Sequence, residues 1–167
     1  VAYSGIVHVG FMLLCLCSYD SPDALKAFFT YILLYLLTSI GFFGIVTSMR
    51  PLLDQSYRSI YFIEFSDLAK KNLGLAIAGM LFIASMAGIP PLAGFFTKFY
   101  VLLVAIESQN YFLGLVALLL SVLSMFYYLR IIRIMWFDPT ITNWISYTPP
   151  ERSCAFLISF SVFIVVV

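Results

Sequence analysis

Three ionisable residues in apolar surroundings are the candidates for chemistry in this sequence: Lys98, His8 and Glu107. Lys98 is the one charged residue in a run of 35 residues, 72–106. It lies nine positions before Glu107, about 13 Å along a helix. An ionised side chain in such a segment is costly and is usually retained for a pathway, a pair or a pocket. Because this depth exceeds the reach of a snorkelling lysine, we expect Lys98 to take up and release a proton.

His8 and Glu107 each allow two interpretations. His8 lies in an apolar segment with Tyr3 and Ser4 one or two helical turns earlier, and it is either a hydrogen-bonded packing residue or a proton-transfer group. Glu107 is either the exit-side acid of a proton path or a solvated helix end. Thr97 adjoins the candidate lysine and could help to hold water beside its ammonium group.

Other polar and sulfur-containing residues favour packing roles. Hydroxyl residues such as Thr38 and Ser85 are interpreted as helix–helix hydrogen-bonding groups rather than site residues. Cys15 and Cys17 point to nearly opposite sides of a helix, and Cys154 is isolated, so all three are interpreted as small apolar residues. The sequence has no phosphate-binding loop, metal-ligand spacing or hydrolytic triad, so neither a metal nor a cofactor site is predicted.

The composition indicates a membrane protein. Hydrophobic residues make up 63% of the chain and charged residues only 10%, which is too little charge to cover the surface of a water-soluble domain. The formal net charge of +1, without a basic cluster, excludes an electrostatic case for nucleic-acid binding. We predict an all-α polytopic membrane helix bundle that forms a single domain over residues 1–167.

The gaps between charged residues predict about five transmembrane spans, at residues 1–19, 25–49, 72–106, 108–137 and 152–167. The third would be about 52 Å long as one straight helix, whereas a bilayer core is about 30 Å thick. It contains Gly88, Pro90, Pro91 and Gly94, and each proline removes a backbone donor. We therefore predict a discontinuous helix, broken near Gly88–Gly94. Freed backbone groups at that depth are tolerated inside protein or beside a hydrated cavity, which points to transport.

Basic residues predict the orientation of the chain. Seven lysines and arginines lie in the loops at 50–71 and 130–152, whereas Lys26 alone lies in those at 20–26 and 107–110. The positive-inside rule places the long loops in the cytoplasm or matrix and the C-terminus on the opposite side. Residues 52–68 are either an amphipathic interfacial segment or an ordinary polar loop.

Three segments resemble motifs of one membrane protein family. They are AYSGIVHVG at residues 2–10, SMAGIPPLAGFFTKFY at 85–100 and SVLSMFYYLRIIRIMWF at 121–137. Together they resemble the antiporter-like membrane subunits of respiratory NADH:ubiquinone oxidoreductase. The middle segment is also similar to Mrp-type cation antiporters and membrane-bound hydrogenase subunits. On this resemblance the five spans correspond to the tenth to fourteenth helices of such a subunit, and the lysine of the family's broken twelfth helix falls on Lys98.

The resemblance implies a proton-translocating part of the membrane arm of that enzyme in the mitochondrial inner membrane, with the long loops in the matrix and the C-terminus in the intermembrane space. NADH, FMN, iron–sulfur clusters and ubiquinone would be bound by other subunits, with no redox site in this chain. Two alternatives stay open: a subunit of an Mrp-type sodium/proton antiporter, and a purely structural membrane-arm element.

The resemblance also implies partners. The acid and lysines that the family carries in earlier helices would precede this chain, which alone would lack a complete relay. We expect a split subunit whose N-terminal helices come from a separate polypeptide; a truncated chain is the alternative. Other partners would be neighbouring antiporter-like subunits and the lipid bilayer, without nucleic acid.

Overall fold

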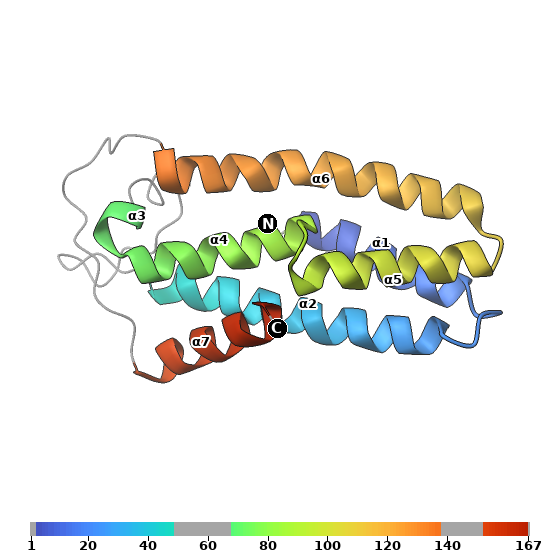
Figure 1. Ribbon diagram of the computed structural model, residues 1–167, viewed down its shortest axis with the longest axis horizontal. Helices are drawn as coiled ribbons and strands as arrows, with labels where there is room; N and C mark the ends of the chain where they lie inside the picture. Colours follow the sequence, from blue (N-terminus) through green and yellow to red (C-terminus); the bar gives the residue numbers. More distant parts are fainter. Residues whose placement is uncertain (1–2, 49–67, 138–151, 167) are drawn as a thin grey trace.

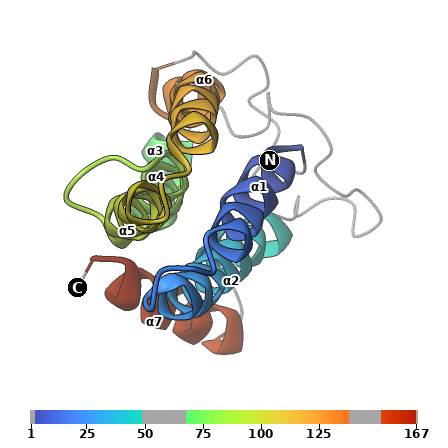
Figure 2. The ribbon, with the colours of Figure 1, turned by 90° about the vertical axis from the view of Figure 1, so that its right-hand side faces the viewer.

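The computed structural model describes residues 3–48, 68–137 and 152–166, and every regular element within them is an α-helix. The helices are α1 (Ser4–Cys17), α2 (Ala24–Ser48), α3 (Leu68–Lys71), α4 (Leu73–Ala87), α5 (Ala93–Glu107), α6 (Tyr111–Phe137) and α7 (Arg152–Val166). Seen end on, α6 and α7 lie at opposite edges of the bundle, with the other long helices between them (Figure 2). The predicted all-α membrane bundle is confirmed.

Within the described part of the chain, two helices are long and apolar enough to cross a membrane on their own. They are α2 with 25 residues and α6 with 27, or about 37 and 40 Å at 1.5 Å per residue. The helices α1, α4 and α7 are apolar but shorter. Large apolar side chains such as Leu33, Phe126 and Phe163 expose more than half of their surface. A lipid bilayer accommodates such a surface, whereas water does not.

The helices α4 and α5 are the two halves of the predicted third span. Each has 15 residues, or about 22 Å, so neither crosses a bilayer core of about 30 Å alone. Figure 1 shows them end to end along the long axis, with the break near the middle of the bundle. The prediction of a broken helix is therefore confirmed. The non-helical segment is residues 88–92, so Gly94 already belongs to α5.

Gly88 ends α4 because it adopts a left-handed conformation, with φ of 84°. The Gly88 and Ile89 amides donate to the Ala84 carbonyl at 3.1 and 3.0 Å, a pattern typical of glycine-terminated helices. The next two residues, Pro90 and Pro91, have no amide hydrogen with which to continue the ladder. The sequence therefore specifies both the position and the sharpness of the break.

A side chain of α4 caps the start of α5. Leu92, at the N-cap position, offers no side-chain acceptor, and the Gly94 amide instead donates to Ser85 Oγ at 3.2 Å. A Cβ atom on Gly94 would overlap the backbone carbonyl group of Ser85. The two half-helices are thus in direct backbone contact, which only glycine allows at position 94.

Two apolar clusters lie on either side of the break. One joins α4 to α2, α6 and α7 and includes Ile45, Phe82 and Met135. The other joins α5 to α1 and α2 and includes Phe11 and Val104. The break and the polar residues around it lie where the two clusters meet.

The α1–α2 and α5–α6 connections lie together at one end of the bundle (Figure 1). Ser108 Oγ donates to the Ser18 carbonyl at 3.1 Å, and Asn110 Nδ2 donates to the Cys17 carbonyl at 3.3 Å. The charge count assigned these same two connections to one side of the membrane. The segment predicted at 52–68 lies outside the described residues except for Leu68, which begins α3.

Replacing Gly94 with alanine tests the contact between the half-helices. We expect Gly94→Ala to lower the free energy of unfolding by about 1–3 kcal/mol, because the added methyl group overlaps the Ser85 backbone. The measurement is the midpoint of thermal unfolding in mild detergent, followed by far-UV circular dichroism. Gly10→Ala is the control, since nothing lies within 4 Å of its added Cβ. An unchanged midpoint for Gly94→Ala would contradict the packing described here.

Candidate functional site

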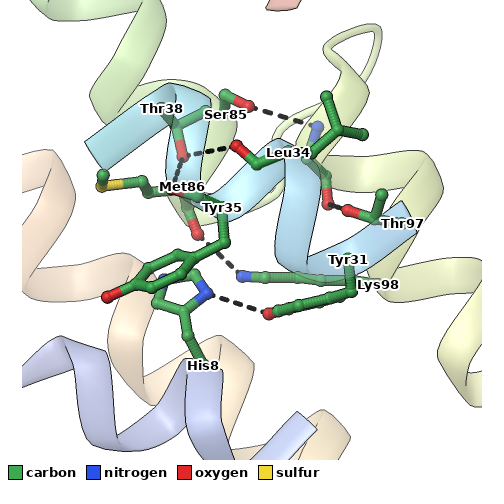
Figure 3. Close-up of a pocket in the computed structure, with 10 residues that line it drawn as sticks. His8, Tyr31, Leu34, Tyr35, Thr38, Ser85, Met86, Thr97 and Lys98 are labelled. Atoms are coloured by element: carbon green, nitrogen blue, oxygen red, sulfur yellow. Dashed lines mark hydrogen bonds between the residues drawn. The ribbon is translucent and has the colours of Figure 1, made fainter. Parts of the chain in front are cut away.

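The ammonium group of Lys98 is buried at the helix break. Only 8% of the residue is exposed, and Nζ donates to the Met86 carbonyl at 2.8 Å (Figure 3). It also donates to the Ala87 carbonyl at 3.2 Å. Hydrogen bonds to a charged group contribute about 1.5–3 kcal/mol each. The pair therefore offsets part of the cost of burying a cation at this depth.

The proline pair explains why these two carbonyls are available. In a continuous helix the Met86 and Ala87 carbonyls would accept from the amides four residues later. Those positions are Pro90 and Pro91, and neither has an amide hydrogen. The two acceptors that lose their helical donors are thus the two that bind the Lys98 ammonium.

Gly88 leaves the space through which the Lys98 side chain reaches these acceptors. A Cβ atom on Gly88 would lie 3.1 Å from Lys98 Cδ and 3.3 Å from Nζ. Its left-handed backbone also disfavours any residue with a side chain. One glycine therefore ends α4 and admits the lysine.

His8 is the second ionisable residue of the site, and 6% of it is exposed. Its Nδ1 lies 2.9 Å from Tyr31 Oη, its Nε2 lies 3.1 Å from Tyr128 Oη, and its ring stacks on Tyr35 at 4.7 Å between centroids. A neutral imidazole has one donor and one acceptor nitrogen, so one tyrosine donates to the ring and the other accepts. The histidine thus links α1, α2 and α6 through hydroxyl groups.

A cavity of about 20 Å³ lies between the lysine and the histidine. Its lining includes His8, Tyr31, Tyr35, Thr38, Ser85, Thr97 and Lys98 (Figure 3). That volume accommodates about one water molecule, and the polar lining offers it hydrogen-bond partners. A single water can therefore connect the ammonium group with the histidine side of the cavity.

No acidic partner for Lys98 lies within the described residues. Among residues 3–48, 68–137 and 152–166, the only ion pair joins Lys26 and Asp23 at 2.7 Å. The ammonium group lies over the ring of Phe11, with 5.8 Å from Nζ to the ring centroid. In this part of the chain, main-chain carbonyls hold the charge.

The structure brings together some of the predicted site residues. Lys98, His8 and Thr97 share the cavity, and the Thr97 hydroxyl donates to the Gly94 carbonyl at 3.1 Å. Glu107 is exposed at the end of α5 and does not line this cavity.

Tyr3 and Ser4 also lie outside the cavity that holds the lysine. Tyr3 is 88% exposed, whereas Ser4 is buried. Both line a second cavity, of about 460 Å³, between α1 and α6.

The three tyrosines around His8 were not predicted from the sequence. Tyr31 and Tyr35 share one face of α2 with Thr38, because these positions are four and seven residues apart. A polar stripe of this kind on an otherwise apolar helix was the available signal. Tyr128 offered no such signal, since it lies 120 positions after His8 in the sequence.

Two hydroxyl residues interpreted as packing groups also line the cavity. Ser85 does bond between the half-helices, through the Gly94 amide. For Thr38 the interpretation as a helix–helix group is wrong, because its hydroxyl donates to the Leu34 and Tyr35 carbonyls of its own helix, both at 3.0 Å.

Comparison with known families gives the site a context. The family described as NADH:quinone oxidoreductase/Mrp antiporter, transmembrane, matches residues 1–124, which contain the break, the lysine and the histidine. The chain belongs to this family. The predicted resemblance to this family is thereby confirmed, and the matched residues include the motifs at 2–10 and 85–100 and the first four residues of the one at 121–137.

Several curated relatives share this sequence. NADH-ubiquinone oxidoreductase chain 2 of Marchantia polymorpha is 37% identical over 99% of this chain and 32% of the relative. The chain 2 protein of Rhizopus oryzae is 44% identical over 83% of this chain and 27% of the relative. NADH-quinone oxidoreductase subunit N of Rhodospirillum rubrum is 39% identical over 83% of this chain and 28% of the relative. The matches thus span 27–32% of the length of these proteins.

A solved structure shares the fold. It is respiratory complex I from Thermus thermophilus with bound aureothin, in which one chain superposes with a TM-score of 0.82 at 24% identity. The match covers 99% of this chain and 36% of that chain. The arrangement of helices in this chain is therefore a fold that also occurs in respiratory complex I.

Replacing Gly88 with alanine tests the fit of the lysine at the break. We expect Gly88→Ala to lower the free energy of unfolding by about 1–2 kcal/mol, because a left-handed backbone is unfavourable for alanine and the methyl group crowds Lys98. Thermal unfolding in mild detergent measures the effect. Gly74→Ala in α4 is the control, since its added Cβ makes only an ordinary 3.6 Å contact. Equal midpoints for both variants would contradict the role given to Gly88.

Proposed function

We propose that this chain is part of the proton-translocating membrane arm of a respiratory NADH:ubiquinone oxidoreductase, as the C-terminal portion of a chain 2 subunit. The observation that carries the proposal is the buried Lys98 ammonium at a broken membrane helix, beside a cavity that also contacts His8. The chain 2 and subunit N relatives support the choice of this enzyme within the family.

The residues of the site can move a proton without a metal or cofactor in this chain. Protonated Lys98 gives a proton to a water molecule in the cavity, and that water gives one to the Tyr31 hydroxyl. Tyr31 in turn gives its original hydroxyl proton to His8 Nδ1, which lies 2.9 Å from Tyr31 Oη. The lysine is then neutral and its hold on the Met86 and Ala87 carbonyls weakens, since an uncharged amine is a poorer donor. Reprotonation restores both bonds, so the charge on Lys98 is coupled to the geometry of the break.

The rest of the relay would lie in the part of the subunit that precedes this segment in the relatives. We propose that a separate polypeptide, or a preceding segment, supplies it and packs against this bundle together with neighbouring antiporter-like subunits. NADH, FMN, iron–sulfur clusters and ubiquinone would be bound by other subunits. Glu107, exposed at the end of α5, is then either an exit-side acid or a solvated helix end.

The membrane would be the mitochondrial inner membrane, with the long loops in the matrix. The α1–α2 and α5–α6 connections, which lie together, would face the intermembrane space. The basic count of seven against one between the two sides supports this orientation.

Substitution of Lys98 tests the proton role. In Lys98→Met we expect the ratio of protons pumped to NADH oxidised to fall while the complex still assembles, because methionine cannot carry a proton. Lys98→Arg keeps a charge but does not release its proton, so it should also lower the ratio. Dye-quench measurements on sealed membrane vesicles, normalised to NADH oxidation, give this ratio.

Lys26→Met is the matched control. Lys26 is exposed and paired with Asp23, so its loss should leave the ratio unchanged. If Lys98→Met pumps normally, the chain is a structural element of the membrane arm and the relay role is excluded.

Native electrophoresis of mild-detergent membrane extracts tests the assignment to the enzyme. We expect this chain in the large band that stains for NADH dehydrogenase activity, together with a polypeptide carrying the N-terminal helices of the subunit, as identified by mass spectrometry. Its presence only in a smaller complex without that activity would instead favour a sodium/proton antiporter, which sodium-dependent transport would verify.

A further inference from the structure

The two ring nitrogens of His8 contact different parts of the bundle. Nδ1 meets Tyr31, which lines the cavity shared with Lys98. Nε2 meets Tyr128, which comes from α6 and does not line that cavity. The imidazole therefore lies between the cavity that contains Lys98 and the Tyr128 hydroxyl of α6.

Tyr128 is fully buried within the apolar cluster of α4 and α6, with 0% of its surface exposed. A phenylalanine would fill almost the same volume without bringing a hydroxyl into this cluster. Burying a hydroxyl is unfavourable unless it is hydrogen-bonded. The bond from Tyr128 to His8 meets this requirement and is the feature that distinguishes tyrosine from phenylalanine here.

A path continues from Tyr128 to a larger cavity. Ser4 lies one helical turn before His8 on the same face of α1, and its side chain reaches the Tyr128 hydroxyl. Ser4 and Arg130 line the cavity of about 460 Å³ between α1 and α6, which has room for many water molecules. A hydroxyl chain thus leads from the imidazole to a space that can hold water.

We propose that Tyr128 is the proton carrier that follows His8, and that protons leave the imidazole through Tyr128 and Ser4 toward the cavity between α1 and α6. This inference rests on the proposed transfer from Lys98 to His8. It assigns the exit from the histidine to α6, which lies beside α4 and α5 (Figure 2).

The transfer is balanced at each atom. A proton added at Nδ1 makes His8 a cation with an N–H bond on both nitrogens. The Nε2–H bond then breaks and an O–H bond forms on the Tyr128 oxygen, while the original Tyr128 hydroxyl proton passes to Ser4 or to water. His8 returns to its neutral form with the proton on Nδ1, which is the opposite tautomer to the starting one. Rotation of the imidazole ring, which breaks and re-forms its two tyrosine hydrogen bonds, returns the proton to the Tyr128 side, and rotation of the hydroxyl hydrogens then resets the chain. No phenolate accumulates and no oxidant or reductant is needed.

Tyr128→Phe in the assembled complex is the main test. We expect the ratio of protons pumped to NADH oxidised to fall about twofold or more. The reason is that loss of a proton-transferring group commonly slows the proton-transfer step itself by about 100-fold or more. Tyr111→Phe, on the exposed start of the same helix, is the control and should leave the ratio unchanged. Native electrophoresis verifies that both variants assemble. An assembled Tyr128→Phe complex with the full ratio overturns the inference.

If the Tyr128→Phe complex does not assemble, two substitutions at Ser4 test the proposed proton path. Ser4→Thr keeps a hydroxyl at this position and Ser4→Ala removes it. A lower pumping ratio in Ser4→Ala, restored in Ser4→Thr, supports the path, because a purely structural role of Tyr128 does not predict this difference. Equal ratios in the two variants overturn it.

The comparison with Lys98→Met separates this inference from the proposed function. If Lys98→Met lowers the ratio and Tyr128→Phe does not, the relay stands but its exit lies elsewhere. If neither variant lowers the ratio, the proton role of the whole site is wrong.

Discussion

The hydrogen bonds from the Lys98 ammonium to the Met86 and Ala87 carbonyls are the interaction on which the rest of the structure depends. Without the ammonium, two carbonyls deep in the bundle would have no donor to replace the ones that Pro90 and Pro91 lack. Without the prolines, those carbonyls would be occupied within the helix and the buried charge would have no acceptors. The break and the lysine therefore stabilise each other at this depth.

The two apolar clusters confine the polar groups to a narrow zone at the middle of the bundle. The cluster around α4 lies on one side of the break and the cluster around α5 on the other. Inside such surroundings the electrostatic effect of a charge on its neighbours is much stronger than in water. A change in the charge of Lys98 therefore changes the electrostatic energy of the adjacent dipoles, because no solvent screens the interaction.

The sequence contained enough information for the helices, the break and the central lysine. Span length against bilayer thickness, with the proline pair, predicted the break, and isolation from other charges singled out Lys98. The partners of His8 could not be predicted, because Tyr31 and Tyr128 lie 23 and 120 positions away and meet it only through helix packing. The acceptors of the lysine were also missed. The proline pair marks the two carbonyls that lack helical donors, but the sequence does not show that the Lys98 side chain reaches them.

The use of main-chain acceptors has a consequence for how the site can change over evolutionary time. A carboxylate partner can be lost in one codon change, but a carbonyl is present whatever residue occupies its position. The side chains at positions 86 and 87 are therefore free to vary as far as the lysine's acceptors are concerned. The site is determined instead by the identities of Gly88, Pro90 and Pro91. These residues have no functional group and act only through the conformation of the backbone.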